Sequence, residues 1–147
     1  MTNTGFDVFD RTVQKSILWV DEVNEELGRD DRQYGYMALR SVLHTLRDRL
    51  TVAEAADLSA QLPLMIRGIY FDGWTPADVP VTIREQDEFL DYINDKMGPQ
   101  VNDLPPTDAL KAVLNVLDKH VTEVEMEDIH KMLPEELKLL WKQAIPA

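Results

Sequence analysis

Hydrophobic residues recur every three or four positions along almost the whole chain, which is the spacing of a helix with one buried face. The spacing predicts a first helix over residues 6–27 and a second over residues 31–49. A third helix is expected to end near Leu62, and a short fourth helix by Gly73. No alternating run of strand length interrupts the pattern, so the fold is predicted to be all-α. The positions expected to be buried in the first two helices are Phe6, Phe9, Val13, Ile17, Val20, Leu27, Leu39, Val42, Leu43, Leu46 and Leu50.

Polar residues and prolines mark where later helices are expected to begin. Thr51 and Glu54 form the capping-box pattern, in which each side chain accepts a hydrogen bond from the other residue's backbone amide. Pro63 suits the first turn of the next helix, because that position needs no amide hydrogen. After the loop GWTPADVPV, Thr82 and Glu85 repeat the capping-box pattern. A second series of helices is therefore predicted to begin there.

The second series of helices resembles the first. Sliding the chain by 71 positions aligns residues 38–71 with residues 109–142 without a gap, and ten of these thirty-four pairs are identical. We therefore predict a single domain over residues 1–147, built from two similar four-helix halves at approximately 6–74 and 82–147. A unit of about 70 residues has little core of its own, so each half is expected to bury its open face against the other. The identical pairs are Ala38/Ala109, Leu39/Leu110, Val42/Val113, Leu43/Leu114, Leu46/Leu117, Thr51/Thr122, Glu54/Glu125, Asp57/Asp128, Leu62/Leu133 and Pro63/Pro134.

Two charged positions have opposite signs in the two halves. Arg47 and Asp48 correspond to Asp118 and Lys119. Equivalent positions approach each other near a two-fold axis, where opposite charges attract. One hypothesis is therefore that Arg47 contacts Asp118 or that Asp48 contacts Lys119. The alternative is that all four are unrelated surface charges.

Composition excludes several functional classes. The chain has 147 residues, of which 44% are hydrophobic and 29% charged, and it has no cysteine, so disulfides, thiol catalysis and thiolate zinc sites are excluded. A net charge of −12 is expected to repel nucleic acid. No apolar run is long enough for a membrane span, and the N-terminus lacks the features of a secretory signal. We expect a cytoplasmic protein that binds neither membrane nor nucleic acid.

A family resemblance adds to this interpretation. The segment LRSVLHTLRDRLTVAEAADLSAQLP, followed by RGIYFDGWTP, resembles the bacterial family of uncharacterised proteins known as domain of unknown function 2267. The second half fits less closely, since KLLWKQAIPA retains an aromatic residue at Trp141 but has no GW after it. The resemblance implies a prokaryotic, cytoplasmic, helical protein. It implies no activity and transfers no catalytic residue.

Two groups of residues are candidates for contact with a ligand or partner. His44, Arg47 and Asp48 fall at spacings of three and four on one face of the second helix, where they can bind an anionic group or form a structural ion pair. The ion pair is the favoured interpretation. The segment YFDGWTPADVP offers Tyr70 and Trp74 either as a recognition edge or, as we favour, as a plug for the end of the bundle. Arg67 is also a candidate, as the one basic residue of the segment after Pro63.

The sharpest metal candidate is the E-x-x-H pair of Glu127 and His130, which would place two ligands on one helix face. A di-iron site needs a second such pair, but the equivalent positions of the first half hold Ala56 and Ser59. We therefore expect a solvated surface pair, no metal site and no cofactor.

Two functional classes remain at this point. The first is a non-enzymatic interaction or regulatory protein that meets a protein partner or a second copy of itself through an exposed helix face or the Trp74 loop. The alternative is a small-ligand or metal-dependent enzyme with its site between the two halves. No nucleophile, base and orienting group occur together in the sequence, so we favour the first class and predict no catalytic residue.

Overall fold

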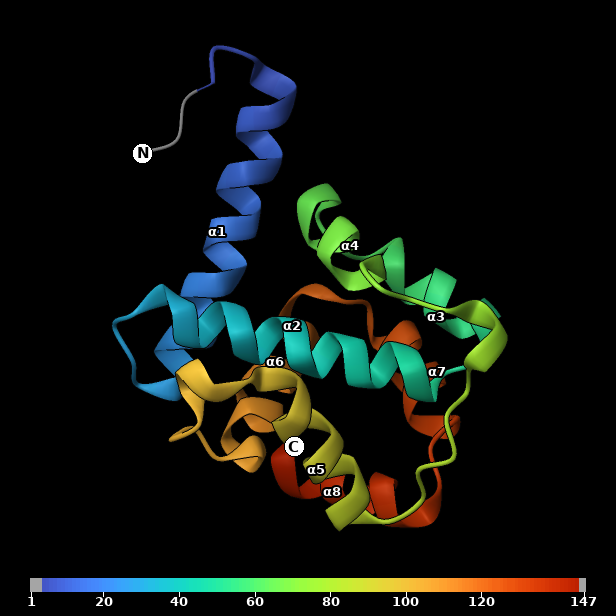
Figure 1. The fold of residues 1–147 in the computed structure, drawn as a ribbon. Coiled ribbons are helices and arrows are strands. Elements are labelled where there is room, and N and C mark those ends of the chain that lie inside the picture. The colour runs from blue at the N-terminus through green and yellow to red at the C-terminus, as the bar shows by residue number, and fades with distance from the viewer. Residues whose placement is uncertain (1–3, 146–147) are drawn as a thin grey trace.

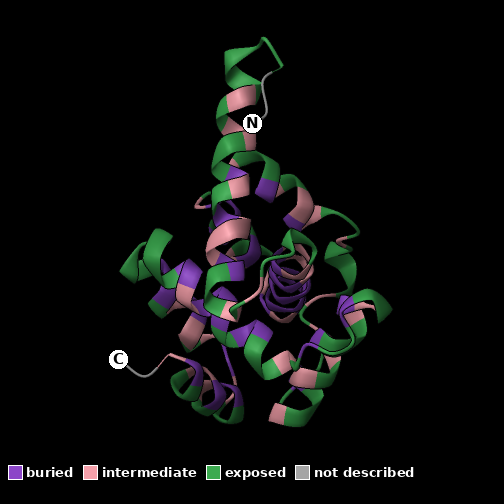
Figure 2. Ribbon diagram, turned by 90° about the vertical axis from the view of Figure 1, so that its left-hand side faces the viewer, coloured by how far each residue is buried: buried purple, intermediate pink, exposed green. Residues whose placement is uncertain are grey.

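Helix α2, Arg32–Arg49, is the most deeply buried element of the molecule. The computed structural model describes residues 4–145 of the chain. In α2 all residues from Ser41 to Asp48 are buried, because α1, α3, α4, α5 and α6 all contact it. Figure 2 views this helix almost end-on, and most of it has the colour of buried residues. The later helices therefore pack around α2.

The described residues form only helices, 3₁₀ turns and connecting segments, which confirms the all-α prediction. The helix α1 ends at Gly28, whose φ of 69° is the left-handed conformation expected for a helix-ending glycine. Short 3₁₀ turns occupy Pro76–Asp78 and Pro99–Val101. The α-helices besides α2 are α1 (Asp7–Leu27), α3 (Val52–Ser59), α4 (Leu64–Phe71), α5 (Gln86–Met97), α6 (Pro106–His120), α7 (Glu123–Lys131) and α8 (Glu135–Ala144).

The helices are arranged around α2 as Figure 1 shows. Helix α6 lies behind α2, while α5 and α8 lie below it in this view. Helices α3 and α4 lie at one side, and α3 contacts α7. Helix α1 packs on α2, α4 and α6 but extends beyond them, so its N-terminal half projects from the rest of the molecule.

The predicted inner face of α2 is confirmed, and that of α1 is partly wrong. Leu39, Val42, Leu43, Leu46 and Leu50 are at most 2% exposed. In α1, however, Phe6 and Phe9 are 54% and 55% exposed, whereas the buried hydrophobic residues are Trp19 and Val23. The spacing of Phe6 and Phe9 was correct for an amphipathic helix, but no element of the described chain covers these two side chains. The remaining predicted positions of α1, all only partly buried, are Val13, Ile17, Val20 and Leu27.

The predicted capping box of Thr82 and Glu85 is also wrong. Helix α5 begins at Gln86, and Glu85 is itself the capping residue, in a box completed by Glu88. The preceding residues are held against α2: the Val81 amide donates to the Asp48 carbonyl at 2.8 Å, and Arg49 Nε donates to the Ile83 carbonyl at 2.7 Å. Because these contacts keep the segment extended, the helix cannot begin at Thr82.

Each half of the chain contributes four of these α-helices in the same order, α1–α4 and α5–α8. The order agrees with an internal duplication, but the duplication itself stays a prediction. None of the helices in residues 4–145 is both long and apolar enough to cross a membrane.

Candidate functional site

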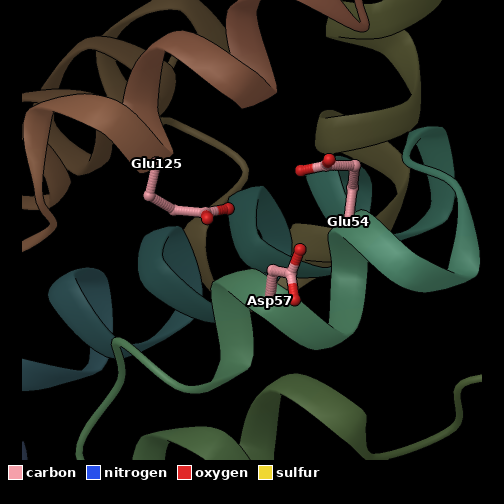
Figure 3. Close-up of side chains that lie close together, drawn as sticks. All are labelled: Glu54, Asp57 and Glu125. Atoms are coloured by element: carbon pink, nitrogen blue, oxygen red, sulfur yellow. The ribbon is translucent and has the colours of Figure 1, made fainter.

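Three carboxylate side chains meet where α3 faces α7. Glu54 and Asp57 project from α3 and Glu125 from α7, and one oxygen of each lies within 4.8 Å of the others. Figure 3 shows the Glu125 side chain reaching across the gap toward the two α3 carboxylates. We call this set of three residues the carboxylate cluster. It joins residues that are far apart in the sequence and come from the two predicted halves.

The N-terminal caps of α3 and α7 place Glu54 and Glu125 where these two helices face each other. Thr51 caps α3 by accepting a hydrogen bond from the Glu54 amide, and Thr122 caps α7 by accepting one from the Glu125 amide, each at 3.3 Å. In a complete capping box, the Glu125 carboxylate would in return accept from the Thr122 amide. That amide donates instead to Gln61 Oε1 at 3.3 Å. The Glu125 carboxylate is therefore free to point toward α3.

Burial and mutual repulsion both act on the carboxylate cluster. Glu125 is only 8% exposed, and its Oε2 atom is buried without a hydrogen-bond partner among the described residues. Burial, followed by the nearby charges of Glu54, Asp57 and Asp128, raises the pKa of Glu125 to about 7. Burial also raises the pKa of Glu54, with further contributions from Asp128 and Asp57. Such a group can hold a shared proton or a cation at neutral pH.

The predicted contact residue His44 faces the protein interior. It is 3% exposed, and its Nε2 atom lies 2.7 Å from the Ile69 carbonyl oxygen. Because a carbonyl can only accept, Nε2 carries the proton that is donated. Burial lowers the pKa of His44 to about 4, so the imidazole is neutral at physiological pH. The side chain fixes α4 against α2, and its burial disfavours the predicted contact with a ligand.

Arg47 and Asp48 form a buried ion pair, 2% and 7% exposed respectively, with Arg47 Nε donating to Asp48 Oδ1 at 2.8 Å. Arg47 Nη1 also donates to the carbonyls of Tyr70 and Asp72, each at 2.8 Å. The second oxygen of Asp48 accepts from the Tyr92 hydroxyl at 2.6 Å. Burial acts to raise the pKa of Asp48, but the hydrogen bonds from Arg47 and Tyr92 hold that pKa below its usual value.

The hypothesis of contacts between the oppositely charged positions is not supported. Arg47 and Asp48 are paired with each other, and Asp48 is approached at 3.6 Å by Lys96 rather than by Lys119. Lys119 instead pairs with Glu22 of α1 at 3.2 Å. In the described chain, Arg47, Asp48 and Lys119 therefore pair with residues other than those that the predicted two-fold relation would give them.

The other predicted contact residues also have partners within the chain. Arg67 Nε donates to the Ser59 carbonyl at 2.9 Å and so caps the end of α3. Tyr70 is fully buried, and its hydroxyl donates to the Ala55 carbonyl at 2.8 Å. Trp74 is half-buried and packs on Phe71, with ring centroids 5.1 Å apart. These placements agree with a packing role; a ligand or partner contact at these residues stays an untested prediction.

The sequence-predicted metal candidate lies apart from the carboxylate cluster. Glu127 is exposed, while the half-buried His130 packs edge-on against Trp141 with ring centroids 5.8 Å apart. The two residues line a shallow surface hollow together with Trp141 and Lys131. Neither belongs to the group of carboxylates that lie close enough together to share a cation.

Sequence reasoning identified Glu54, Asp57 and Glu125 only as retained positions of the repeat. Glu54 was interpreted as a capping-box residue, because its spacing from Thr51 fits that pattern, and Glu125 is its identical partner in the second half. The identical pairs Glu54/Glu125 and Asp57/Asp128 were the available signal. A two-fold relation between the halves would have placed these carboxylates at the interface between the two halves.

The fold and the site define an all-helical protein with a partly buried group of carboxylates between its third and seventh helices. Residues 18–140 match the family described as "Uncharacterized conserved protein (DUF2267)". The chain therefore belongs to this family. The matched stretch contains the carboxylate cluster but not Phe6 or Phe9. No curated protein matches the chain.

Proposed function

We propose that the protein is a non-enzymatic interaction or regulatory protein of the bacterial cytoplasm, and that it binds a second copy of itself. The observation that carries this proposal is a group of large apolar side chains without cover on α1 and α4. These residues, which we call the α1–α4 face, are Phe6, Val8, Phe9, Leu64 and Met65, and each is 43–59% exposed.

The α1–α4 face continues the buried face of α1. Val8 and Phe9 lie fifteen and fourteen positions before Val23, spacings that bring them near the same side of the helix as Val23 and Trp19. Further along α1 that side is covered by the core, whereas its N-terminal half is exposed (Figure 2). The Met65 amide donates to Thr12 Oγ1 at 2.9 Å, which holds the start of α4 beside α1. Large apolar side chains exposed in this number on two neighbouring helices favour a protein partner.

Charge favours a second copy as this partner. The N-terminal half of α1 carries Asp7 and Asp10 first, and then Arg11 and Lys15. When two copies of the helix pack antiparallel about a two-fold axis, the acidic end of each meets the basic positions of the other. The same axis covers the apolar residues of both copies at once. The net charge of −12 disfavours nucleic acid as the partner.

Molar mass in solution tests the proposal. Light scattering after gel filtration, over a range of concentrations, should show a reversible monomer–dimer equilibrium. The substitution Phe9→Ser should shift it to monomer without loss of stability, because the side chain is already 55% exposed. Leu139→Ser is the matched control, since Leu139 is 53% exposed on α8 and lies outside the face. A wild-type chain that stays monomeric, or equal effects of both substitutions, would contradict self-association through this face.

The carboxylate cluster favours a second candidate function, namely a ligand-dependent or metal-dependent one with its site between the two predicted halves. The cluster contains carboxylates from both α3 and α7, and its Glu125 is buried and incompletely hydrogen-bonded. It lies on helices other than those of the α1–α4 face, so the two candidates can be tested independently.

A further inference from the structure

We infer that Glu54, Asp57 and Glu125 bind one hard divalent cation, with Ca²⁺ as the preferred ion, and that this cation links α3 to α7. The inference goes beyond the proposed interaction function and does not depend on it. It rests on the geometry of the carboxylate cluster and on the hydrogen bonding of Glu125.

The hydrogen bonding of Glu125 indicates that its carboxylate lacks a partner. The side chain is 8% exposed and its Oε2 atom has no hydrogen bond among the described residues, although it points toward Glu54 and Asp57 (Figure 3). The amide that could have satisfied it, that of Thr122, donates to Gln61 instead. A buried carboxylate oxygen without a partner costs free energy, which a bound cation would remove.

Of the two α3 carboxylates, Glu54 shows the same shortage of a partner, whereas Asp57 is exposed to solvent. Glu54 Oε2 is buried and has no hydrogen bond among the described residues. Among the charges that act on Glu54 and Glu125, all are acidic, including Asp128 of α7. Three converging carboxylates without a basic partner are typical of a cation site.

The ligand atoms select the class of cation. All three are carboxylate oxygens, which hard ions such as Ca²⁺, Mg²⁺ and Mn²⁺ prefer over the softer transition metals. The three oxygens lie within 4.8 Å of one another, which is close enough for small side-chain movements to bring all three onto one ion. Ca²⁺ accepts irregular arrangements of six to eight oxygen ligands, whereas Mg²⁺ demands a near-ideal octahedron. Three carboxylates from two separate helices therefore suit Ca²⁺ better, and water can complete its coordination.

Calorimetric titration of the full chain with CaCl₂, after removal of metals with a chelator, tests the site. We expect one Ca²⁺ per wild-type chain and a rise in melting temperature of about 5 °C at saturation. Glu125→Gln should weaken binding at least about tenfold, because it removes one charged ligand of three. In the chelator this variant should melt no lower than the wild type, since it removes a repelling buried charge. Glu54→Gln removes a different ligand and should also weaken Ca²⁺ binding, which makes it a second, independent test of the site.

The matched control is Glu127→Gln, which removes one charge from an exposed position of the same helix. It should bind Ca²⁺ as the wild type does. The inference is overturned if the wild type binds neither Ca²⁺, Mg²⁺ nor Mn²⁺, which would leave a shared proton in the cluster. It is overturned equally if Glu127→Gln weakens binding as much as Glu125→Gln, because the effect would then be general charge screening. Tighter binding of Mg²⁺ than of Ca²⁺ would overturn the preference for Ca²⁺.

Discussion

At the scale of single residues, several polar side chains that were candidates for ligand contact are buried and hold neighbouring helices together. His44, Arg47 and Asp48 were correctly predicted to lie on one helix face, because spacings of three and four determine this directly. The sequence could not show that the face is enclosed, since the enclosing residues Tyr70, Asp72 and Tyr92 are distant in the chain. The favoured prediction of a structural ion pair agrees with the contact between Arg47 and Asp48.

The burial of His44 predicts a specific dependence of stability on pH. Its pKa falls from 6.5 to about 4 on folding. As the pH decreases below 6.5, the unfolded chain takes up a proton at His44 that the folded chain does not accept until about pH 4. His44 therefore lowers the free energy of unfolding progressively between about pH 7 and pH 4, by at most about 3 kcal/mol, and no further below that range.

The substitution His44→Gln isolates this contribution, because the glutamine amide can still donate to the Ile69 carbonyl but does not titrate. Urea unfolding of both proteins should be measured at intervals from pH 7.5 to pH 4.5. The difference in their free energies of unfolding should move in favour of the glutamine variant as the pH falls. A difference that stays constant over this range would contradict the assignment, since all other titrating groups are common to both proteins.

At the scale of elements, α5 is fixed to α2 by one carboxylate. Asp48 Oδ2 accepts a hydrogen bond from the Tyr92 hydroxyl at 2.6 Å, and Lys96 approaches the same oxygen at 3.6 Å. Tyr92→Phe should lower the free energy of unfolding by about 2 kcal/mol, because a hydrogen bond to a charged, buried group is lost. Urea unfolding measures this change. Tyr36→Phe is the control, since the Tyr36 hydroxyl has no hydrogen-bond partner among the described residues; an equal loss there would contradict the role of Asp48.

Element boundaries were predictable where local chemistry determines them. Gly28 ends α1 and Thr51 caps α3, as expected, because the left-handed glycine and the threonine cap need only neighbouring residues. The start of α5 was not predictable, because contacts with α2 delay it from Thr82 to Gln86. The exposure of Phe9 was missed for a related reason: periodicity identifies an apolar face but not whether another element covers it.

At the scale of the whole molecule, the candidate site depends on contacts that no local pattern encodes. Glu54 and Glu125 are 71 positions apart in the sequence and face each other only because α3 packs against α7. The prediction of two similar halves aligned Glu54 with Glu125 in the sequence, but it did not establish that the two side chains lie close together in space. The general class of site named as the alternative, one between the halves, nevertheless agrees with the position of the carboxylate cluster.

The packing of α2 against helices of both predicted halves implies that the chain unfolds as one unit. Helix α2 contacts α1, α3 and α4 as well as α5 and α6. Leu114 of α6 is fully buried, so Leu114→Ala should lower the free energy of unfolding by about 3 kcal/mol. If unfolding is cooperative, amide hydrogen exchange should accelerate equally at the most protected positions of α2 and of α6.

Exchange rates distinguish this behaviour from that of two separable halves. Loss of protection confined to α5–α8 would show that the second half unfolds alone and that the single-domain prediction is wrong. Leu139→Ala, at a side chain that is 53% exposed, should leave exchange in both helices unchanged. Since the carboxylate cluster requires α3 and α7 to stay in contact, cooperative unfolding would also mean that a cation bound there stabilises both halves together.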